Sequence, residues 1–307
     1  MTGLGKHCSG YLDKKLKYGN RMIELPSLEY YISWHCNLKC ANCITGSPYR
    51  DEEFSDIESF KRDVDNLSQY MHVGVLRLLG GEPTLNPEIA EYLKYAKQSN
   101  LCDVTAVLTN GVKLMAMPDE FYDNCDIVTI SRYENAGINY DKIFNYLDNR
   151  GQRWNLQNVP DHPKSIGVWK QNVSPELRSV LAWGEEFRVL DQFEELNEDT
   201  AQAVYTSCSG KTYCATFLDG KYYRCAVSIH RPGYYKAIGV PLPYDLKELD
   251  GIPIDEQFIE RYYEAINSEK ININACRFCK GYGDALETTN EPHRQLSIKE
   301  INAKRKP

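Results

Sequence analysis

Three cysteines, Cys36, Cys40 and Cys43, lie within eight positions of one another in the segment SWHCNLKCANCITG. Thiolates this close together can share one metal centre, but the Cys-x3-Cys-x2-Cys spacing leaves a tetrahedral ion one protein ligand short. His35 could complete a zinc site, yet it is adjacent to Cys36, and neighbouring residues of a strand point to opposite sides. The other interpretation is a [4Fe–4S] cluster held by three cysteines, with one iron left open for a small-molecule ligand.

A hairpin signal lies in the segment CSGKTYCATFLDGKYYRC (208–225), where Asp219–Gly220 separates two β-rich arms. Asp-Gly is a preferred pair for a two-residue hairpin turn. Pairing outward from this turn sets Cys214 opposite Cys225, and cross-strand Cβ atoms are ~4.5–5.5 Å apart. Both thiolates could therefore reach one metal centre.

The hairpin cysteines have companions elsewhere in the sequence. Cys276 and Cys279 form a Cys-x2-Cys pair about fifty residues after the hairpin. We therefore predict a second metal site. Five cysteines compete for its four positions: the pattern of residues leaves open whether Cys208 or Cys214 joins Cys225 and the Cys-x2-Cys pair, and whether the remaining thiol is a spare hydrogen donor.

Composition excludes several classes of protein. The 307 residues carry a net charge of −7, whereas a nucleic-acid-binding protein is expected to have a basic face. The apolar runs are short and broken by charges, so no membrane span is expected. The first twenty residues lack the apolar core of a secretion signal. We therefore expect a cytoplasmic protein, whose eleven cysteines serve metal or redox chemistry rather than a disulfide framework.

Strand-like and helical segments alternate from residue 28 to about residue 200. The strand-like segments are 28–34, 73–81, 103–111, 125–133, 154–159 and 185–193. The helical segments are 55–71, 87–98 and 140–150. This alternation predicts an α/β fold in which right-handed βαβ units surround a parallel sheet, as a full or partial barrel. After residue 200 the pattern changes, and the basic end, KEINAKRKP, is expected to be a frayed tail.

The helix over 55–71 illustrates the local signals. Ser55 and Glu58 have the spacing of a capping box. Four apolar residues then fall on one helical face and are expected to be buried: Ile57, Phe60, Val64 and Leu67.

Residues able to bind a ligand follow four of the predicted strands. They are Cys36, Gly80–Gly81, Asn110–Gly111 and Ser131–Arg132. Ligands of parallel α/β folds gather at the carboxyl ends of the strands. We therefore expect one site at that edge of the sheet.

Taken together, these segments resemble the radical S-adenosylmethionine (radical SAM) enzymes. The matching segments are CNLKCANC at 36–43, GGEP at 80–83, TNG at 109–111 and ISRY at 130–133. The resemblance implies a partial (β/α)6 TIM-like barrel over residues 28–200, with a [4Fe–4S] cluster on the first cysteine group and SAM on the open iron. Asn42 departs from the family, which usually has an aromatic residue before the third cysteine.

The same resemblance assigns cofactor contacts. The SAM amino group would face the glycine-rich segment, a ribose hydroxyl an asparagine, and the SAM carboxylate a serine or arginine, which suits the charge of each group. The implied residues are Gly80, Gly81, Glu82 and Pro83 for the first contact, Asn110 for the second, and Ser131 or Arg132 for the third.

The second cysteine group resembles the SPASM and shorter twitch domains, which carry auxiliary clusters. Their opening pattern appears as Cys208, Gly220 and Cys225, and a twitch domain completes one [4Fe–4S] cluster with a Cys-x2-Cys pair. The family pattern thus favours Cys208, whereas the hairpin geometry favours Cys214. This interpretation divides the chain into an N-terminal extension (1–27), the barrel (28–200), an auxiliary-cluster domain of hairpin and helices (201–290) and a C-terminal tail (291–307).

The resemblance also implies a function. SAM cleavage would give a 5′-deoxyadenosyl radical that abstracts hydrogen from unactivated carbon. An external donor such as flavodoxin or ferredoxin would supply the electron. We expect a carbohydrate or cyclitol substrate, oxidised at a carbinol carbon with the auxiliary cluster as electron acceptor. Three further functions stay open: a sugar epimerase that uses a cysteine hydrogen donor, an enzyme modifying ribosomal peptides, and a non-catalytic electron carrier similar to ferredoxin.

The remaining histidines and cysteines carry no predicted chemistry. The histidines lack companions at metal spacing and are expected to be solvated or hydrogen-bonded: His162, His230 and His293. The cysteines are expected to pack as ordinary small residues: Cys8, Cys102 and Cys125.

Overall fold

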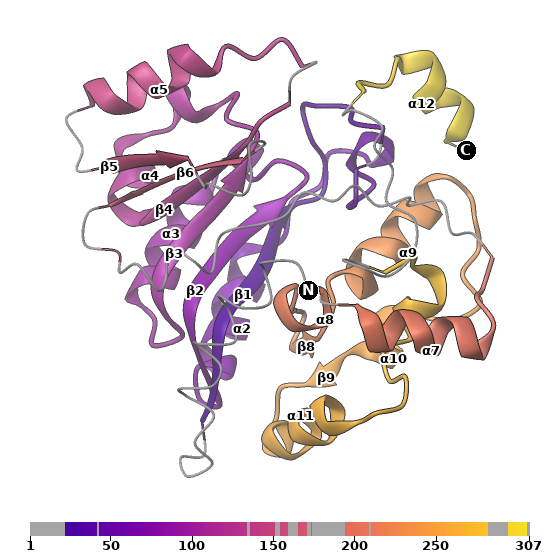
Figure 1. Ribbon diagram of the computed structural model, residues 1–307. Coiled ribbons are helices and arrows are strands. Elements are labelled where there is room, and N and C mark those ends of the chain that lie inside the picture. Colours follow the sequence, from indigo (N-terminus) through magenta and orange to yellow (C-terminus); the bar gives the residue numbers. More distant parts are fainter. Residues whose placement is uncertain are drawn as a thin grey trace.

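The computed structural model describes residues 22–41, 43–133, 136–150, 154–158, 165–170, 173, 194–208, 210–281 and 294–305. Within them, nine strands form one sheet in the order β5-β6-β4-β3-β2-β1-β7-β8-β9 (Figure 1). None of the described helices is long and apolar enough to span a membrane.

Four parallel strands form the first half of the sheet, and helices connect them. The strands are β1 (Ile23–Ser33), β2 (Met71–Gly80), β3 (Cys102–Thr109) and β4 (Ile127–Ser131). The helices are α2 (Ile57–Leu67), α3 (Ile89–Gln98), α4 (Asp119–Asn124) and α5 (Tyr140–Asn149). The predicted α/β class, with β/α units of a partial barrel, is confirmed.

Beyond β4 the sheet departs from the predicted pattern. β6 (Ser165–Lys170) pairs antiparallel with both β4 and β5 (Trp154–Asn158). The two strands therefore form a hairpin rather than further parallel units, because no described helix returns the chain to the opposite edge between them. The predicted sixth strand, 185–193, lies outside the described residues.

A second group of elements extends the same sheet past β1. The strands are β7 (Thr216–Leu218), β8 (Lys221–Tyr223) and β9 (Ile252–Pro253). The helices are α7 (Glu198–Ser207), α8 (Gly210–Tyr213), α9 (Val227–Ala237), α10 (Leu246–Asp250), α11 (Phe258–Asn267) and α12 (Ile298–Lys304). β7 joins β1 through one parallel pair, Glu29 with Thr216, so the two halves of the chain share a single sheet. In Figure 1, α7, α9, α10 and α11 gather on the β7–β9 side of β1.

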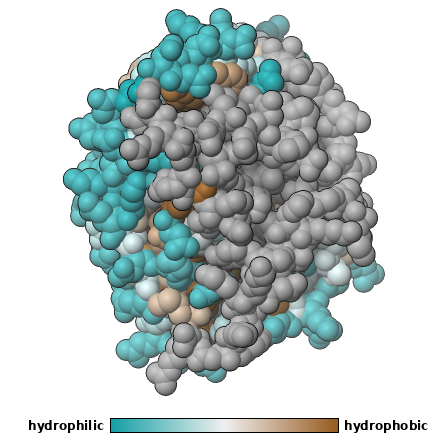
Figure 2. All heavy atoms as spheres, turned by 60° about the vertical axis from the view of Figure 1, so that its left-hand side comes forward, coloured by the Kyte–Doolittle hydropathy of each residue, from teal (hydrophilic) through white to brown (hydrophobic). Residues whose placement is uncertain are grey.

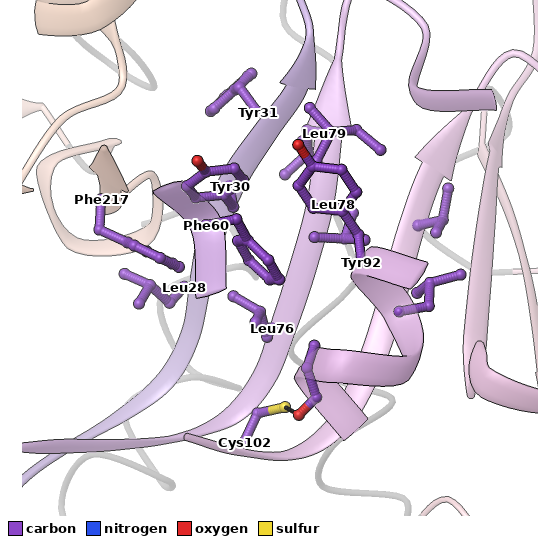
Figure 3. Close-up of a cluster of buried hydrophobic side chains, with 14 of the residues drawn as sticks. Leu28, Tyr30, Tyr31, Phe60, Leu76, Leu78, Leu79, Tyr92, Cys102 and Phe217 are labelled. Atoms are coloured by element: carbon purple, nitrogen blue, oxygen red, sulfur yellow. Dashed lines mark hydrogen bonds between the residues drawn. The ribbon is translucent and has the colours of Figure 1, made fainter. Parts of the chain in front are cut away.

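Aromatic side chains fill the space between β1, β2 and the helices that cover them. Tyr30 packs against Phe60 of α2 and Phe217 of β7, with ring centroids 4.7 and 4.8 Å away (Figure 3). Tyr31, the next residue, turns to the other side of β1, where its ring lies 4.1 Å from that of His230. The described surface in the view of Figure 2 is mostly hydrophilic. One face of β1 thus packs against α2, and its other face packs against α9 through Tyr31 and His230.

The local predictions for α2 are only partly confirmed. Its four predicted core residues are buried, but the N-cap is Asp56, whose carboxylate accepts a hydrogen bond from the Ser59 amide at 2.8 Å. The proposed Ser55 capping box is therefore wrong. The Ser55 hydroxyl instead donates to the carbonyl of Tyr31 in β1, at 2.6 Å.

Candidate functional site

The first cysteine group lies on the loop that follows β1. The Leu38 amide approaches Cys36 Sγ at 3.3 Å, Gln295 Nε2 approaches Cys40 Sγ at 3.2 Å, and Cys43 Sγ lies 3.2 Å from the Thr45 hydroxyl. Donors aimed at sulfur stabilise thiolates and tune the potential of an iron–sulfur cluster. The residues around these sulfurs therefore fit such a cluster.

The pKa values of Cys36 and Cys40 in this loop also fit an iron–sulfur cluster. Burial, followed by the neighbouring Cys43 sulfur, raises the pKa of Cys40 to about 11. Burial also raises the pKa of Cys36 well above its ordinary value, and both Glu82 and Cys43 add to the effect. Thiolates at these positions need nearby positive charge, and iron ions supply it.

Residues 294–305, close to the C-terminal end of the chain, contact the cysteine loop, and we call this segment the clasp. Gln295 Oε1 accepts a hydrogen bond from the Lys39 amide at 2.7 Å, and the Leu296 amide donates to the Lys39 carbonyl at 2.7 Å. α12 follows and lies beside the loop (Figure 1). The predicted frayed tail is therefore wrong, and Gln295 is a residue of the candidate site that was not predicted from the sequence. The spacing of Ser297 and Glu300, which form a capping box, could have predicted the start of α12. No pattern in the sequence predicts that this segment contacts the cysteine loop.

Gly80 and Gly81 allow β2 to end against the start of the cysteine loop. The Gly81 amide donates to the Ser33 carbonyl at 2.8 Å. A Cβ on Gly80 would lie 2.4 Å from that carbonyl oxygen, and a Cβ on Gly81 would lie 2.2 Å from the carbonyl oxygen of His35. Both glycines are required by close approach to the protein backbone, rather than only to a ligand as the sequence analysis assumed.

Glu82 is fully buried and ties the GGEP segment to the end of β3. Its Oε1 accepts from the hydroxyls of Thr84 (2.5 Å) and Thr109 (2.6 Å) and from the Thr84 amide (3.1 Å), and its Oε2 accepts from the Asn110 amide (2.8 Å). Burial raises the pKa of Glu82, and these hydrogen bonds oppose the rise. One lone pair of Oε2 is left for an external donor. The predicted contact with the SAM amino group stays a prediction, and the adjacent Pro83 begins a 3-10 turn, Pro83–Leu85.

Asn110 connects the end of β3 to the cysteine loop. Its Nδ2 donates to Asn37 Oδ1 at 2.8 Å and lies 3.7 Å from Cys36 Sγ, while its Oδ1 accepts from the Val112 amide at 3.0 Å. The structure thus places Asn110 at the predicted edge of the sheet. Its contact with a ribose stays a prediction.

Ser131 is the last residue of β4 and Arg132 follows it, at the same edge. Arg132 lines a pocket of about 430 Å³ together with Tyr140, whose ring lies 5.7 Å from the guanidinium carbon. Among the described residues, no carboxylate lies within ion-pair distance of Arg132. A free guanidinium suits a carboxylate ligand, which agrees with the predicted role of Arg132.

The predicted hairpin of the second cysteine group is confirmed. Leu218 pairs with Lys221 across a turn in which both Asp219 and Gly220 have positive φ, 52° and 74°, the geometry of a type I′ turn. Beyond the ladder, the Ala226 amide donates to the carbonyl of Cys214 at 2.9 Å. Cys214 and Cys225 are therefore brought together at the open end of the hairpin.

All five cysteines of the second group lie close together. Burial, and then the sulfurs of Cys276, Cys208, Cys214 and Cys279 in that order, raise the pKa of Cys225 well above its ordinary value. The sulfurs of Cys279 and Cys208 act in the same direction on Cys276. Buried thiols that raise one another's pKa need positive charge nearby in order to ionise. A metal cluster with several cations would supply that charge.

Asp250 holds the Cys-x2-Cys segment in place. Its Oδ1 accepts from the Asn274 amide at 2.6 Å, and its Oδ2 accepts from the Ala275 amide at 2.9 Å and the Ser228 hydroxyl at 2.7 Å. These contacts fix the backbone immediately before Cys276 and join it to α9. The sequence analysis did not identify Asp250, because its partners lie far from it along the chain.

The structure shows no zinc site among the described residues. Over the described part of the chain, no set of three or more histidine, cysteine or acidic side chains surrounds one ion-sized point. A four-iron cluster binds its cysteines at separate corners and therefore spreads them apart. His35, the candidate fourth ligand for zinc, packs against Phe54 with ring centroids 4.9 Å apart.

Three further predictions concern single residues. Cys102 and Cys125 are buried, as expected. His230 is neither solvated nor hydrogen-bonded: it is 2% exposed, and neither ring nitrogen has a partner in the described structure. The expectation for His230 is therefore wrong, because α9 places it between Tyr31 and Trp34. Other unassigned residues lie outside the described ranges: Cys8, His162 and His293.

Comparison with known proteins agrees with the geometry of the first cysteine group. Residues 30–132 match the family profile "Radical SAM superfamily". This third of the chain is similar to the radical SAM domains. The matched range runs from β1 to Arg132 and includes all three cysteines and the GGEP and TNG segments. A radical SAM domain implies binding of SAM and of one [4Fe–4S] cluster.

Named relatives match over short stretches of the chain. A GTP 3′,8-cyclase from Chlorobaculum tepidum is 35% identical over 80 residues, 26% of this chain and 24% of the cyclase. Mycofactocin maturase MftC from Mycobacterium tuberculosis is 31% identical over 95 residues, 31% of this chain and 24% of the maturase. The matches thus span about a quarter of each relative. A crystal structure of BtrN in complex with AdoMet and 2-DOIA covers 89% of this chain and 98% of BtrN, at 13% identity and a TM-score of 0.44, a level that decides nothing about substrate.

Proposed function

We propose that this chain is a radical SAM enzyme whose first cluster is bound by Cys36, Cys40 and Cys43. The hydrogen-bond donors around these sulfurs and the match of the surrounding domain support the assignment. When bound, the cluster and SAM supply a 5′-deoxyadenosyl radical able to remove hydrogen from an unactivated carbon. Glu82 and Asn110 keep the three loops in register, and Arg132, which has no carboxylate partner among the described residues, offers a cation for the SAM carboxylate.

We assign an auxiliary [4Fe–4S] cluster to Cys208, Cys225, Cys276 and Cys279. Burial and the sulfurs of Cys279 and Cys208 raise the pKa of Cys276. Burial and the sulfur of Cys214 raise the pKa of Cys225 and the pKa of Tyr31 in β1. Because Cys214 acts on Tyr31 of β1 as well as on Cys225, we assign it as the thiol that does not bind the cluster. This choice agrees with the family pattern rather than with the simple hairpin argument.

The reaction we propose is oxidation of a carbinol carbon in a carbohydrate or cyclitol. The observation that carries this proposal is the position of the second cysteine group: the Glu29 amide of β1 donates to the carbonyl of Ala215, one residue after Cys214, at 2.9 Å. An auxiliary cluster there would be close enough to β1 to accept an electron from a substrate bound beside that strand. An external donor such as flavodoxin or ferredoxin would reduce the first cluster.

Iron content and product analysis test this function. Anaerobically reconstituted protein should hold about eight irons, from two four-iron clusters. Replacing Cys36, Cys40 and Cys43 by Ala should leave about half the iron, and replacing Cys214 by Ala should leave all of it. A screen of sugars and cyclitols should then show 5′-deoxyadenosine together with a carbonyl product. Stoichiometric zinc in place of iron would refute the proposal.

Epimerisation is the second candidate function, and the position of Cys214 is the observation that favours it. A thiol beside Tyr31 could return a hydrogen atom to a substrate radical. In deuterated water, an epimerase should place deuterium on the reacting carbon, and its Cys214→Ala variant should form 5′-deoxyadenosine without inverted product. A carbonyl product without label on carbon would exclude epimerisation.

A further inference from the structure

Cationic side chains and a buried histidine surround Trp34, which lies two residues before the first cysteine group. The guanidinium carbon of Arg50 is 4.4 Å from the centre of the Trp34 ring, Lys247 Nζ is 6.0 Å away, and the His230 ring is 5.7 Å away. Arg50 follows the first cysteine group, whereas His230 belongs to α9, which begins just after Cys225. The cluster of side chains therefore joins the segment that carries the first cysteine group to the helix that follows Cys225.

Two of these side chains have buried hydrogen-bonding atoms that nothing in the described structure satisfies. Neither ring nitrogen of His230 has a partner, and neither does Nη1 of Arg50. The other terminal nitrogen of Arg50, Nη2, pairs with Glu53 at 2.9 Å. Native proteins rarely leave buried polar atoms unsatisfied without a functional reason. A ligand able to accept hydrogen bonds would supply the missing partners.

Arg50 is held so that it cannot turn away from this position. Its guanidinium lies flat against Gly233 of α9, where an added Cβ would be only 2.8 Å from the guanidinium carbon. Its side chain is 10% exposed. A fixed planar donor at this depth is suited to an oxyanion, because a guanidinium presents its N–H groups in one plane.

Positive charge exceeds negative charge around Trp34. Arg50 has one carboxylate partner, Glu53, and Lys247 has none within ion-pair distance among the described residues. The Arg231 cation also acts on His230. A neutral sugar hydroxyl would not balance this charge, whereas an anionic group would.

We propose that Arg50, His230 and Lys247 bind a phosphate group of the substrate. The inference rests on the proposed function only in taking the phosphate to be part of the molecule that reacts, which narrows the substrate to a phosphorylated sugar or cyclitol. Three donors reach the site from three separate segments, and a phosphate presents three terminal oxygens in different directions. A carboxylate has two oxygens in one plane and matches this arrangement less well.

Binding should be coupled to a proton on His230. Burial is the main reason that the pKa of His230 lies well below its ordinary value, and the charges of Arg50, Arg231 and Lys247 lower it further. The other ring that packs on it, Tyr31, has its own pKa raised by burial and is neutral. A bound dianion opposes the effect of the three cations, so phosphate binding should be accompanied by proton uptake and should strengthen as the pH falls.

Calorimetric titration of the anaerobically reconstituted full chain tests the proposal. Inorganic phosphate and glucose 1-phosphate should bind saturably, with proton uptake visible as a dependence of the heat on the buffer. Glucose should not bind under the same conditions. Lys247→Gln and His230→Gln should each weaken phosphate binding at least tenfold. Lys236→Gln is the matched control, since Lys236 is exposed on the same helix as His230.

Three outcomes would overturn the phosphate site. These are the absence of saturable phosphate binding to the wild-type chain, unchanged binding in the Lys247→Gln variant, and tighter binding of acetate than of phosphate. Lys247 is only partly buried, so its variant should fold even if the His230 variant does not. SAM cleavage separates this inference from the proposed function: cleavage without phosphate binding refutes only the phosphate site, and phosphate binding without cleavage refutes only the enzyme.

Discussion

At the scale of single residues, Glu82 joins two motifs that lie 27 positions apart. Its buried carboxylate satisfies the amide and hydroxyl of Thr84, the hydroxyl of Thr109 and the amide of Asn110. The motif GGEP was readable from the sequence, and its place at the carboxyl end of β2 is confirmed. The internal role of Glu82 was not readable, because it depends on how β3 packs beside β2.

Glu82→Gln should therefore lower stability as well as SAM binding. The amide group of glutamine would bring an N–H group against the Asn110 amide or the two hydroxyls, leaving buried donors unpaired at a cost of about 1–3 kcal/mol. Chemical denaturation of the apo protein measures this loss. Glu88→Gln, six positions along and exposed, should have no effect, and equal stability of the two variants would contradict the internal role of Glu82.

At the scale of elements, features set by neighbouring residues were predicted correctly, whereas the direction of strand pairing was not. The turn at Asp219–Gly220 and the core face of α2 follow from local residue chemistry, and both are confirmed. The antiparallel direction of β6 was not predicted, because strand direction depends on the length and path of the connection rather than on strand composition. The N-cap of α2 is Asp56 rather than the predicted Ser55, because the Ser55 hydroxyl donates a hydrogen bond to a backbone carbonyl of β1.

Asp63 of α2 anchors the hairpin that carries Cys214 and Cys225. Its Oδ1 accepts from the Gly220 amide at 2.9 Å, and its Oδ2 is buried without a partner in the described structure. Burial raises the pKa of Asp63 to about 6 from its usual 3.8. The folded state thus favours the protonated carboxyl. As the pH rises through about 6 the carboxyl ionises, and the contribution of its proton to the free energy of unfolding is lost.

Asp63→Asn should consequently be more stable than the wild type at pH 7.5, by about 1–2 kcal/mol. The asparagine oxygen can still accept from Gly220, and no charge is buried. At pH 4.5 the difference should fall to about a third of that value. Urea denaturation at the two pH values measures it, with exposed Asp65→Asn as control. A variant less stable than the wild type at pH 7.5 would show that the charged hydrogen bond outweighs the cost of burial.

At the scale of the whole molecule, one sheet carries both cysteine groups. The first group follows β1, and the second lies at the end of the hairpin that pairs with β1 through Thr216. Sequence analysis predicted both groups, but it treated them as parts of separate domains. That one sheet joins them could not be predicted, since it depends on contacts between residues such as Glu29 and Thr216, 187 positions apart.

The clasp by residues 294–305 should tune the first cluster. Gln295→Leu removes the donor to Cys40 Sγ, and loss of a hydrogen bond to a cluster sulfur should lower the reduction potential. Potentiometric titration followed by electron paramagnetic resonance measures the shift. Arg294→Gln, which removes only an exposed pair with Glu300, should leave the potential unchanged. A potential equally unchanged in Gln295→Leu would show that this contact does not act on the cluster.

The clasp also sets an order of events during synthesis. Gln295 follows Cys40 by 255 residues, which at ribosomal rates is a delay of roughly 10–50 s. For most of that interval the cysteine loop has left the ribosome, and residues 294–305 have not yet been translated. Iron–sulfur delivery proteins therefore have a window in which Cys40 is more accessible than in the finished chain, and faster translation would shorten it.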